Sequence, residues 1–91
     1  MIYPYMTMKD NTEYTHSEMK PDGTVLVYVE TPDEKDGFHS LICELPTYKI
    51  KELKGYNNKE KEEIIERIKN NAHLIIEYSQ IGGFESNAAS A

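Results

Sequence analysis

The strongest pattern along the chain is an apolar repeat at helical spacing over residues 57–81. At about 100° per residue, the apolar and small side chains gather within one arc of about 120°, which defines a core face. These positions are Ile64, Ile65, Ile68, Ala72, Ile75, Ile76 and Ser79. Asn57 and Glu60 have the spacing of a capping box, and Gly82 is suited to the C′ position. The pattern predicts one long amphipathic helix.

Three segments before the helix have the composition of β-strands. Residues 24–30 are β-branched or aromatic at nearly every position, residues 38–45 are mostly apolar, and residues 13–19 have a weaker strand character. Residues 20–24, KPDGT, predict a turn because proline presets φ and glycine accepts a positive φ. Residues 31–37 form an acidic loop, which we expect to join the second and third strands as a hairpin.

Three other segments decide how large the sheet is. Residues 48–53 alternate between apolar and lysine side chains, which suits either a fourth strand or a connector. Residues 1–11 form either a short edge strand, where Pro4 is tolerated, or a flexible arm, and we expect the arm. Residues 84–91 are small and polar and are also expected to be flexible. The sequence therefore predicts a single α+β domain over residues 1–91, with a three- or four-stranded antiparallel sheet and one long C-terminal helix packed on one face.

The composition indicates a small protein of a reducing compartment. Cys43 is the single cysteine, so an internal disulfide is ruled out. No apolar run approaches the roughly 18 residues that span a bilayer, and the N-terminus lacks a basic region followed by an apolar core. We therefore expect a cytoplasmic protein without a membrane partner.

The charge is acidic overall and unevenly distributed. The formal net charge is −6, but residues 48–61 contain five lysines and only two glutamates. An acidic surface repels nucleic acid, so only this lysine segment is suited to an anion. Tyr48 and Ile50 alternate with Lys49 and Lys51, and stacking on a single strand requires aromatics and cations on one face. Nucleic acid is therefore not an expected partner.

Metal ligation is weakly supported by the pattern of histidines and acids. His73 and Glu77 lie one helical turn apart, but they supply two ligands where zinc sites use three or four. The acidic loop at residues 33–37 does not match a calcium-binding EF-hand, because Lys35 stands at a ligand position and no helix precedes the loop. We interpret it as a solvated turn and predict no metal or cofactor.

No arrangement for nucleophilic catalysis is evident either. His39 and Cys43 share one face of a predicted strand but lie about 13 Å apart at strand rise, too far to pair. The apolar neighbours of Cys43 suit a buried and unreactive thiol. His16 and His39 belong to different predicted strands, and whether they meet in a pocket is open. We predict no catalytic residues and no enzyme activity.

The second predicted strand is apolar on both faces. Val25, Val27 and Val29 point to one face, whereas Leu26 and Tyr28 point to the other. One helix covers one face, so the other must be covered by a second copy of the chain or by another protein. Along the flank of the helix, a further apolar group has two interpretations, namely burial beneath the sheet or the N-terminal arm, or contact with a subunit. Its members are Leu74, Tyr78 and Ile81.

These observations lead to two functional hypotheses. The first is a small non-enzymatic protein-interaction or regulatory module that self-associates as a homodimer, with Leu26, Tyr28, Leu74, Tyr78 and Ile81 as interface residues. The alternative is a small-ligand-binding protein or an enzyme whose pocket forms between subunits. In that case His16, His39 and tyrosines would be brought together by folding.

Overall fold

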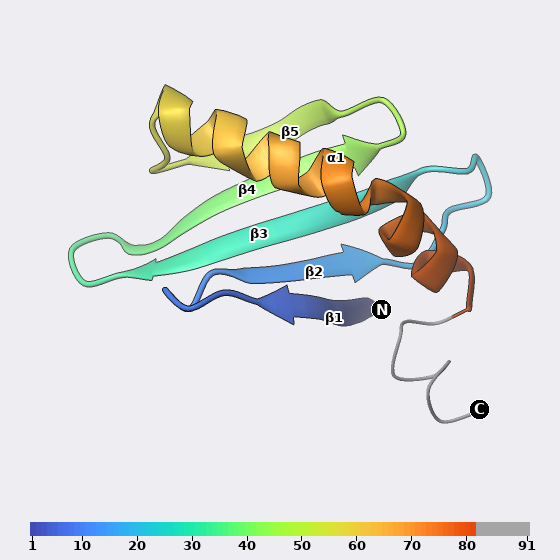
Figure 1. Ribbon diagram of the computed structural model, residues 1–91, viewed down its shortest axis with the longest axis horizontal. Helices are drawn as coiled ribbons and strands as arrows, with labels where there is room; N and C mark the ends of the chain where they lie inside the picture. The colour runs from blue at the N-terminus through green and yellow to red at the C-terminus, as the bar shows by residue number, and fades with distance from the viewer. Residues whose placement is uncertain (82–91) are drawn as a thin grey trace.

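The computed structural model describes residues 1–81 and contains, in this part of the chain, one five-stranded antiparallel sheet and one helix (Figure 1). The elements are β1 (Ile2–Thr7), β2 (Glu13–Ser17), β3 (Val25–Asp33), β4 (Gly37–Leu45), β5 (Lys49–Lys54) and α1 (Asn58–Ile81). Strands that follow one another in the chain are neighbours in the sheet, in the order β1-β2-β3-β4-β5. The predicted α+β class and C-terminal helix are confirmed, with five strands in place of three or four.

The N-terminal segment corrects the expectation of a flexible arm over residues 1–11. Ile2–Thr7 pairs with β2 as an edge strand, with an irregularity in register between Pro4 and Met6. Pro4 is accommodated because an edge strand leaves one row of backbone groups unpaired, so its missing N–H need not interrupt the ladder. The Tyr5 hydroxyl donates a hydrogen bond of 2.7 Å to Asn71 Oδ1 of α1, which ties this strand to the helix. Residues 84–91 lie outside the described part of the chain.

The hairpin of β3 and β4 is longer than the sequence predicts. It pairs residue by residue from Val25 with Leu45 to Asp33 with Gly37, so the expected loop at residues 31–37 shrinks to a turn of three residues. Asp33 Oδ1 accepts the backbone N–H groups of Lys35 and Asp36 at 2.8 and 3.0 Å, which stabilises the turn. The two predicted strands and their hairpin pairing are confirmed.

The segment after β4 resolves into a strand. Lys49–Lys54 pairs with β4 as the edge strand β5, with an irregularity opposite Ile42 and Cys43. The apolar and lysine alternation therefore belongs to a strand and not to a connector. Ile50 lies opposite Cys43 on the side of the sheet that faces the helix.

The helix begins with the predicted capping box. Asn57 Oδ1 accepts the N–H of Glu60 at 2.8 Å, and Glu60 Oε1 accepts the N–H of Asn57 at 2.9 Å. Five residues of the predicted core face are buried, namely Ile64, Ile68, Ala72, Ile75 and Ser79. Ile65 and Ile76 are half-buried at its edges. The expected C′ position of Gly82 lies outside the described residues.

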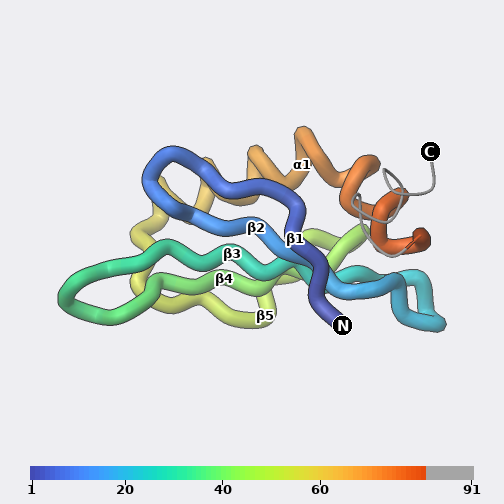
Figure 2. The backbone as a smooth tube through the Cα atoms, turned by 90° about the horizontal axis from the view of Figure 1, so that it is seen from below, coloured from blue at the N-terminus to red at the C-terminus, as the bar shows by residue number. Residues whose placement is uncertain are grey.

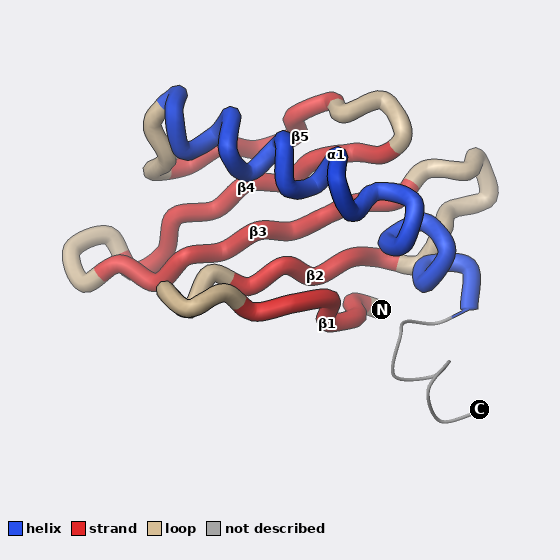
Figure 3. Tube along the Cα trace, viewed as in Figure 1, coloured by secondary structure: helices blue, strands red, loops and turns tan. Residues whose placement is uncertain are grey.

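The core lies between one face of the sheet and α1. The helix crosses the sheet diagonally, from β5 at its start towards β1 and β2 at its end (Figure 3). Beneath it, alternate strand residues are almost completely shielded from solvent: Tyr14, His16, Val25, Val27, Val29, Leu41, Cys43 and Leu45. Seen along the sheet, α1 lies on one side only (Figure 2). The fold is thus a two-layer α+β arrangement.

Candidate functional site

The sheet face that points away from α1, called the open face below, is not covered by any segment within residues 1–81 (Figure 2). Along β3, fully buried valines alternate with half-buried Leu26 and Tyr28, as the sequence predicts. Ile42 of β4 lies directly opposite Tyr28 and is also half-buried. These three side chains form an apolar centre on the open face.

Strand register arranges the open face in rows that run across the sheet. The rows are Glu13, Glu30, Ser40 and Lys54; then Thr15, Tyr28, Ile42 and Glu52; then Leu26, Glu44 and Lys49. Each row ends in a residue of β5, and the first two continue past β2 to the uncharged residues Thr7 and Pro4 of β1. The charges near the two ends of a row influence which surface can pack against this one.

Acidic and basic groups occupy opposite sides of the open face. Glu13 and Glu30 are direct cross-strand neighbours, and like charges in this position are destabilising. Neither forms an ion pair within the described chain. At the other side, β5 contributes Lys49 and Lys54, and the Lys51 ammonium lies 3.5 Å from Glu44 Oε2. The open face thus has an apolar centre and an acidic side at β2 and β3. Its β5 side carries Lys49 and Lys54 together with one acid, Glu52, which accepts a hydrogen bond from Ser40.

The residues that the sequence suggests as an interface fall on two separate surfaces. Leu26 and Tyr28 lie on the open face, whereas the group from the end of α1 lies on the helix side of the sheet. The Tyr78 ring lies 6.1 Å from the Tyr5 ring of β1, in agreement with the interpretation that the helix end packs beneath the N-terminal strand. Leu74 is half-buried and Ile81 is 45% exposed, so a subunit contact at Ile81 stays a prediction.

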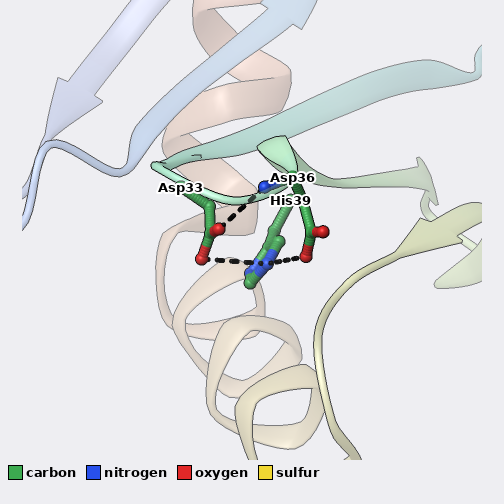
Figure 4. Close-up of side chains that lie close together, drawn as sticks. All are labelled: Asp33, Asp36 and His39. Atoms are coloured by element: carbon green, nitrogen blue, oxygen red, sulfur yellow. Dashed lines mark hydrogen bonds and ion pairs between the residues drawn. The ribbon is translucent and has the colours of Figure 1, made fainter.

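At the tip of the β3–β4 hairpin, three polar side chains converge (Figure 4). His39 Nε2 lies 3.3 Å from Asp33 Oδ2 and 3.4 Å from Asp36 Oδ2. Hydrogen bonds from two backbone N–H groups and the nearby His39 lower the pKa of Asp33, so its carboxyl group is ionised at neutral pH. The solvated turn predicted from residues 33–37 did not include His39, so this cluster was not predicted. The signal was the spacing Asp-x-x-Asp-x-x-His across a tight turn.

A second polar feature lies beside the first half of α1. A cleft of about 520 Å³ is lined by residues of the β1–β2 connection, β2, β3 and the helix, and Tyr14 and Arg67 are among them. Tyr14 is 1% exposed, and its hydroxyl has no hydrogen-bond partner in the described residues. Burial raises the pKa of Tyr14, and the Arg67 side chain, which approaches the hydroxyl without a hydrogen bond of standard geometry, opposes the rise. An unpartnered buried hydroxyl is unusual, because it loses its hydration without replacement.

Tyr56, in contrast, has a fully partnered hydroxyl on the same side of the sheet. It lies 2.8 Å from Thr31 Oγ1 and donates to the His39 carbonyl oxygen at 3.2 Å. Thr31 in turn lies 2.7 Å from Thr12 Oγ1, which completes a chain of three hydroxyl groups. These contacts link the start of β2, the end of β3 and the residue before the helix cap.

Substitution by phenylalanine is expected to have different effects on the free energy of unfolding at Tyr56 and at Tyr14. Tyr56→Phe should lower the free energy of unfolding by about 1 kcal/mol, because two hydrogen bonds are lost. Tyr14→Phe should leave it unchanged or raise it by about 1 kcal/mol, because the buried hydroxyl that is removed has no partner. Urea denaturation of both variants measures the difference. If Tyr14→Phe lowered the free energy of unfolding as much as Tyr56→Phe does, the Tyr14 hydroxyl would have a hydrogen-bond partner after all.

The remaining candidates for chemistry lie apart. His16 is completely buried in β2, and its Nδ1 lies 2.9 Å from the Ser17 carbonyl oxygen. His39 lies at the tip of the β3–β4 hairpin, so the two histidines do not meet within one chain. Cys43 is completely buried, and burial with the neighbouring Glu44 raises the pKa of its thiol to about 11. The thiol is therefore protonated at neutral pH, as its apolar sequence neighbours suggest.

The geometry described above is the main guide to the function of this protein. The helix in the described part of the chain is neither apolar enough nor of the composition needed to cross a membrane. No protein-family model, no curated protein and no solved structure shows significant similarity to this chain.

Proposed function

We propose that this protein is a self-associating, non-enzymatic interaction module, and that the open face of one copy packs against the open face of a second. The observation that carries the proposal is the open face itself, where Leu26, Tyr28 and Ile42 form an apolar centre between an acidic side and the lysines of β5. The opposite face of the same strands is fully buried by α1. Apolar side chains at the centre of a polar rim are typical of protein interfaces.

The distribution of charge favours a second copy of this chain as the partner. A two-fold axis parallel to the strands, between β3 and β4, places β5 of one copy over β2 of the other at the same height along the strands. Lys54 of the second copy then faces Glu13, and the unfavourable pairing of Glu13 with Glu30 is relieved. In the next row, Tyr28 of one copy faces Ile42 of the other. The first two rows are therefore complementary to themselves, whereas the third places Glu44 of one copy opposite Leu26 of the other.

The open face is small for a permanent interface. Strands about 4.8 Å apart and five to nine residues long give a face of roughly 500 Å². This is smaller than the roughly 800 Å² per partner of a standard interface. We therefore propose a reversible dimer with micromolar affinity, with the two sheets aligned at about −30° as in other stacked antiparallel sheets.

Sedimentation velocity over a wide range of protein concentrations tests this proposal. Ile42→Glu should raise the dissociation constant of the dimer at least about tenfold, because it places a carboxylate in the apolar centre. Ile81→Glu is the matched control, since Ile81 is exposed at the end of α1, away from the open face. Circular dichroism confirms that both variants are folded. A monomer at every concentration, or a dimer that only Ile81→Glu weakens, would overturn the proposal.

A charge exchange tests the orientation of the two copies. Glu13→Lys and Lys54→Glu should each weaken the dimer, because each places like charges opposite one another across the two-fold axis. The double variant restores opposite charges at both positions and should recover most of the lost affinity. Additive weakening in the double variant would mean that the two residues do not meet in the dimer.

The second candidate function, small-ligand binding, is favoured by one observation, the unpartnered Tyr14 hydroxyl beside Arg67 in the cleft of about 520 Å³. The related idea of an inter-subunit pocket built from His16 and His39 has less support, because His16 is completely buried within its own chain.

A further inference from the structure

We infer that Asp33, Asp36 and His39 form a binding site for a divalent transition-metal ion such as Zn²⁺, at the tip of the β3–β4 hairpin (Figure 4). The site is separate from the open face, and its occupation does not depend on the proposed dimer. It combines one imidazole nitrogen with two carboxylate oxygens, which is a donor set used by first-row transition metals.

The positions of the three donor atoms suit a single small cation. One donor atom from each residue lies within 4.8 Å of the other two, and His39 Nε2 lies 3.3 and 3.4 Å from the two aspartate oxygens. A triangle with these sides has a centre about 2.4 Å or less from every corner, whereas zinc bonds to histidine nitrogen and carboxylate oxygen are about 2.0–2.2 Å long. A contraction of a few tenths of an ångström completes the coordination.

The surroundings hold the imidazole in place. The His39 ring makes an edge contact with the Tyr56 ring at 5.5 Å, and its backbone carbonyl accepts the Tyr56 hydroxyl. On another side, Gly55 lies so close that a side chain there would collide with the ring. His39 is only 18% exposed, and its Nε2 is directed at the carboxylates. The His39 side chain therefore loses little conformational freedom when it binds a metal ion.

Hydrogen bonds from the chain do not supply a full donor to each of the two carboxylate oxygens that face the His39 ring, so one of them is left to water or to a cation. A neutral imidazole has one N–H group, which can donate well to one acceptor at a time. Asp33 Oδ1 is occupied by the N–H groups of Lys35 and Asp36, whereas its Oδ2 faces the ring together with Asp36 Oδ2. A divalent cation would neutralise both carboxylates and accept the imidazole lone pair, with water at its open positions.

The donor set also predicts selectivity. Ca²⁺ requires six to eight oxygen ligands and Mg²⁺ retains most of its water, so a site with one nitrogen and two carboxylates should bind both ions weakly. Zn²⁺ accepts nitrogen and oxygen in a tetrahedral arrangement, and its fourth position would be filled by water. We therefore expect Zn²⁺ to bind more tightly than either alkaline-earth ion.

Titration calorimetry of the full chain, first treated with chelator, tests the site with ZnCl₂. We expect one Zn²⁺ per chain, and at least tenfold weaker binding for Asp36→Asn and for His39→Gln. Glu34→Gln is the matched control, because it removes a carboxylate from the same turn without touching the cluster. Asp36 is 62% exposed, so its substitution should leave the fold intact.

The imidazole resonances provide a second readout. On addition of Zn²⁺, the side-chain NMR signals of His39 should shift, whereas those of His73, on the exposed side of α1, should not. An ion pair without metal affinity would give no Zn²⁺ binding in the wild-type chain and would overturn the inference. So would equal weakening by Glu34→Gln and Asp36→Asn, Ca²⁺ binding as tight as Zn²⁺ binding, or a shift confined to His73.

Discussion

Ile68→Ala is expected to lower the free energy of unfolding by about 2–5 kcal/mol. Ile68 is completely buried at the centre of α1, where it packs against the valines and leucines on the helix side of the sheet. Removal of three carbon atoms loses their transfer free energy and leaves a cavity, which rigid neighbouring strands fill only in part. Urea denaturation at one fixed protein concentration measures the loss.

The matched control is Ile81→Ala in the same helix. Ile81 is 45% exposed, so the same truncation there should change the free energy of unfolding by about 0.5 kcal/mol or less. Both substitutions remove the same three carbon atoms, and alanine has the higher helix propensity, so the change of propensity does not account for a loss at Ile68. If the two variants were equally stable, α1 would not pack on the sheet through the face that contains Ile68. The fixed protein concentration matters because any dimer adds stability by mass action.

Gly55→Ala is expected to cost about 2–5 kcal/mol of unfolding free energy, from backbone strain and steric overlap together. Gly55 has a φ of 88°, which residues with a side chain adopt at a cost of roughly 1–2 kcal/mol. A Cβ atom there would also lie 2.6 Å from His39 Cγ and 3.0 Å from His39 Nε2. These separations are below van der Waals contact, so the imidazole would have to move.

Gly23→Ala separates the two contributions. Gly23 has nearly the same φ, 85°, but a Cβ atom there would meet nothing within 4 Å. Its substitution should therefore cost only the backbone term, about 1–2 kcal/mol. In a His39→Ala background the steric term disappears, and Gly55→Ala should then fall to the level of Gly23→Ala. If Gly55→Ala still lowered the free energy of unfolding by the full amount in the His39→Ala background, steric overlap with the His39 ring would not be the cause of the loss.

Gly55→Ala also connects stability with the proposed metal site. The displaced imidazole would carry Nε2 away from the two aspartates, so Zn²⁺ affinity should fall although no ligand has been removed. Gly23→Ala lies at another turn and should leave that affinity unchanged. Comparison of Zn²⁺ affinity in the two glycine variants thus distinguishes a site with defined ligand geometry from carboxylates that attract cations by charge alone.

Some elements of this protein were determined by short stretches of sequence. The capping box of Asn57 and Glu60 and the spacing of Ile64, Ile68 and Ile75 depend only on residues within a few helical turns. The alternation along β3 is also local, because successive side chains of any strand point to opposite faces. These features could therefore be predicted, and so could the apolar character of both faces of β3.

The edge strands and the hairpin tip depended on contacts that a single sequence does not specify. Ile2–Thr7 becomes a strand only because β2 is present to pair with it and Asn71 to bind Tyr5. The cluster of Asp33, Asp36 and His39 exists because β3 and β4 pair up to Asp33 and Gly37, which leaves a turn of three residues. A loop over residues 31–37, as expected from composition, would not have paired Thr31 with His39 or Asp33 with Gly37, and these pairings fix the three side chains next to one another.

The chain by itself determined that one helix would cover one side of an apolar sheet, because hydrophobic spacing is a local property of sequence. Only the tertiary structure decided which side chains stand next to each other on the open face. The row from Glu13 to Lys54 spans four strands, and its order follows from the registers of three pairings. Register depends on packing across the whole sheet, because a shift of one residue would turn every side chain to the other face.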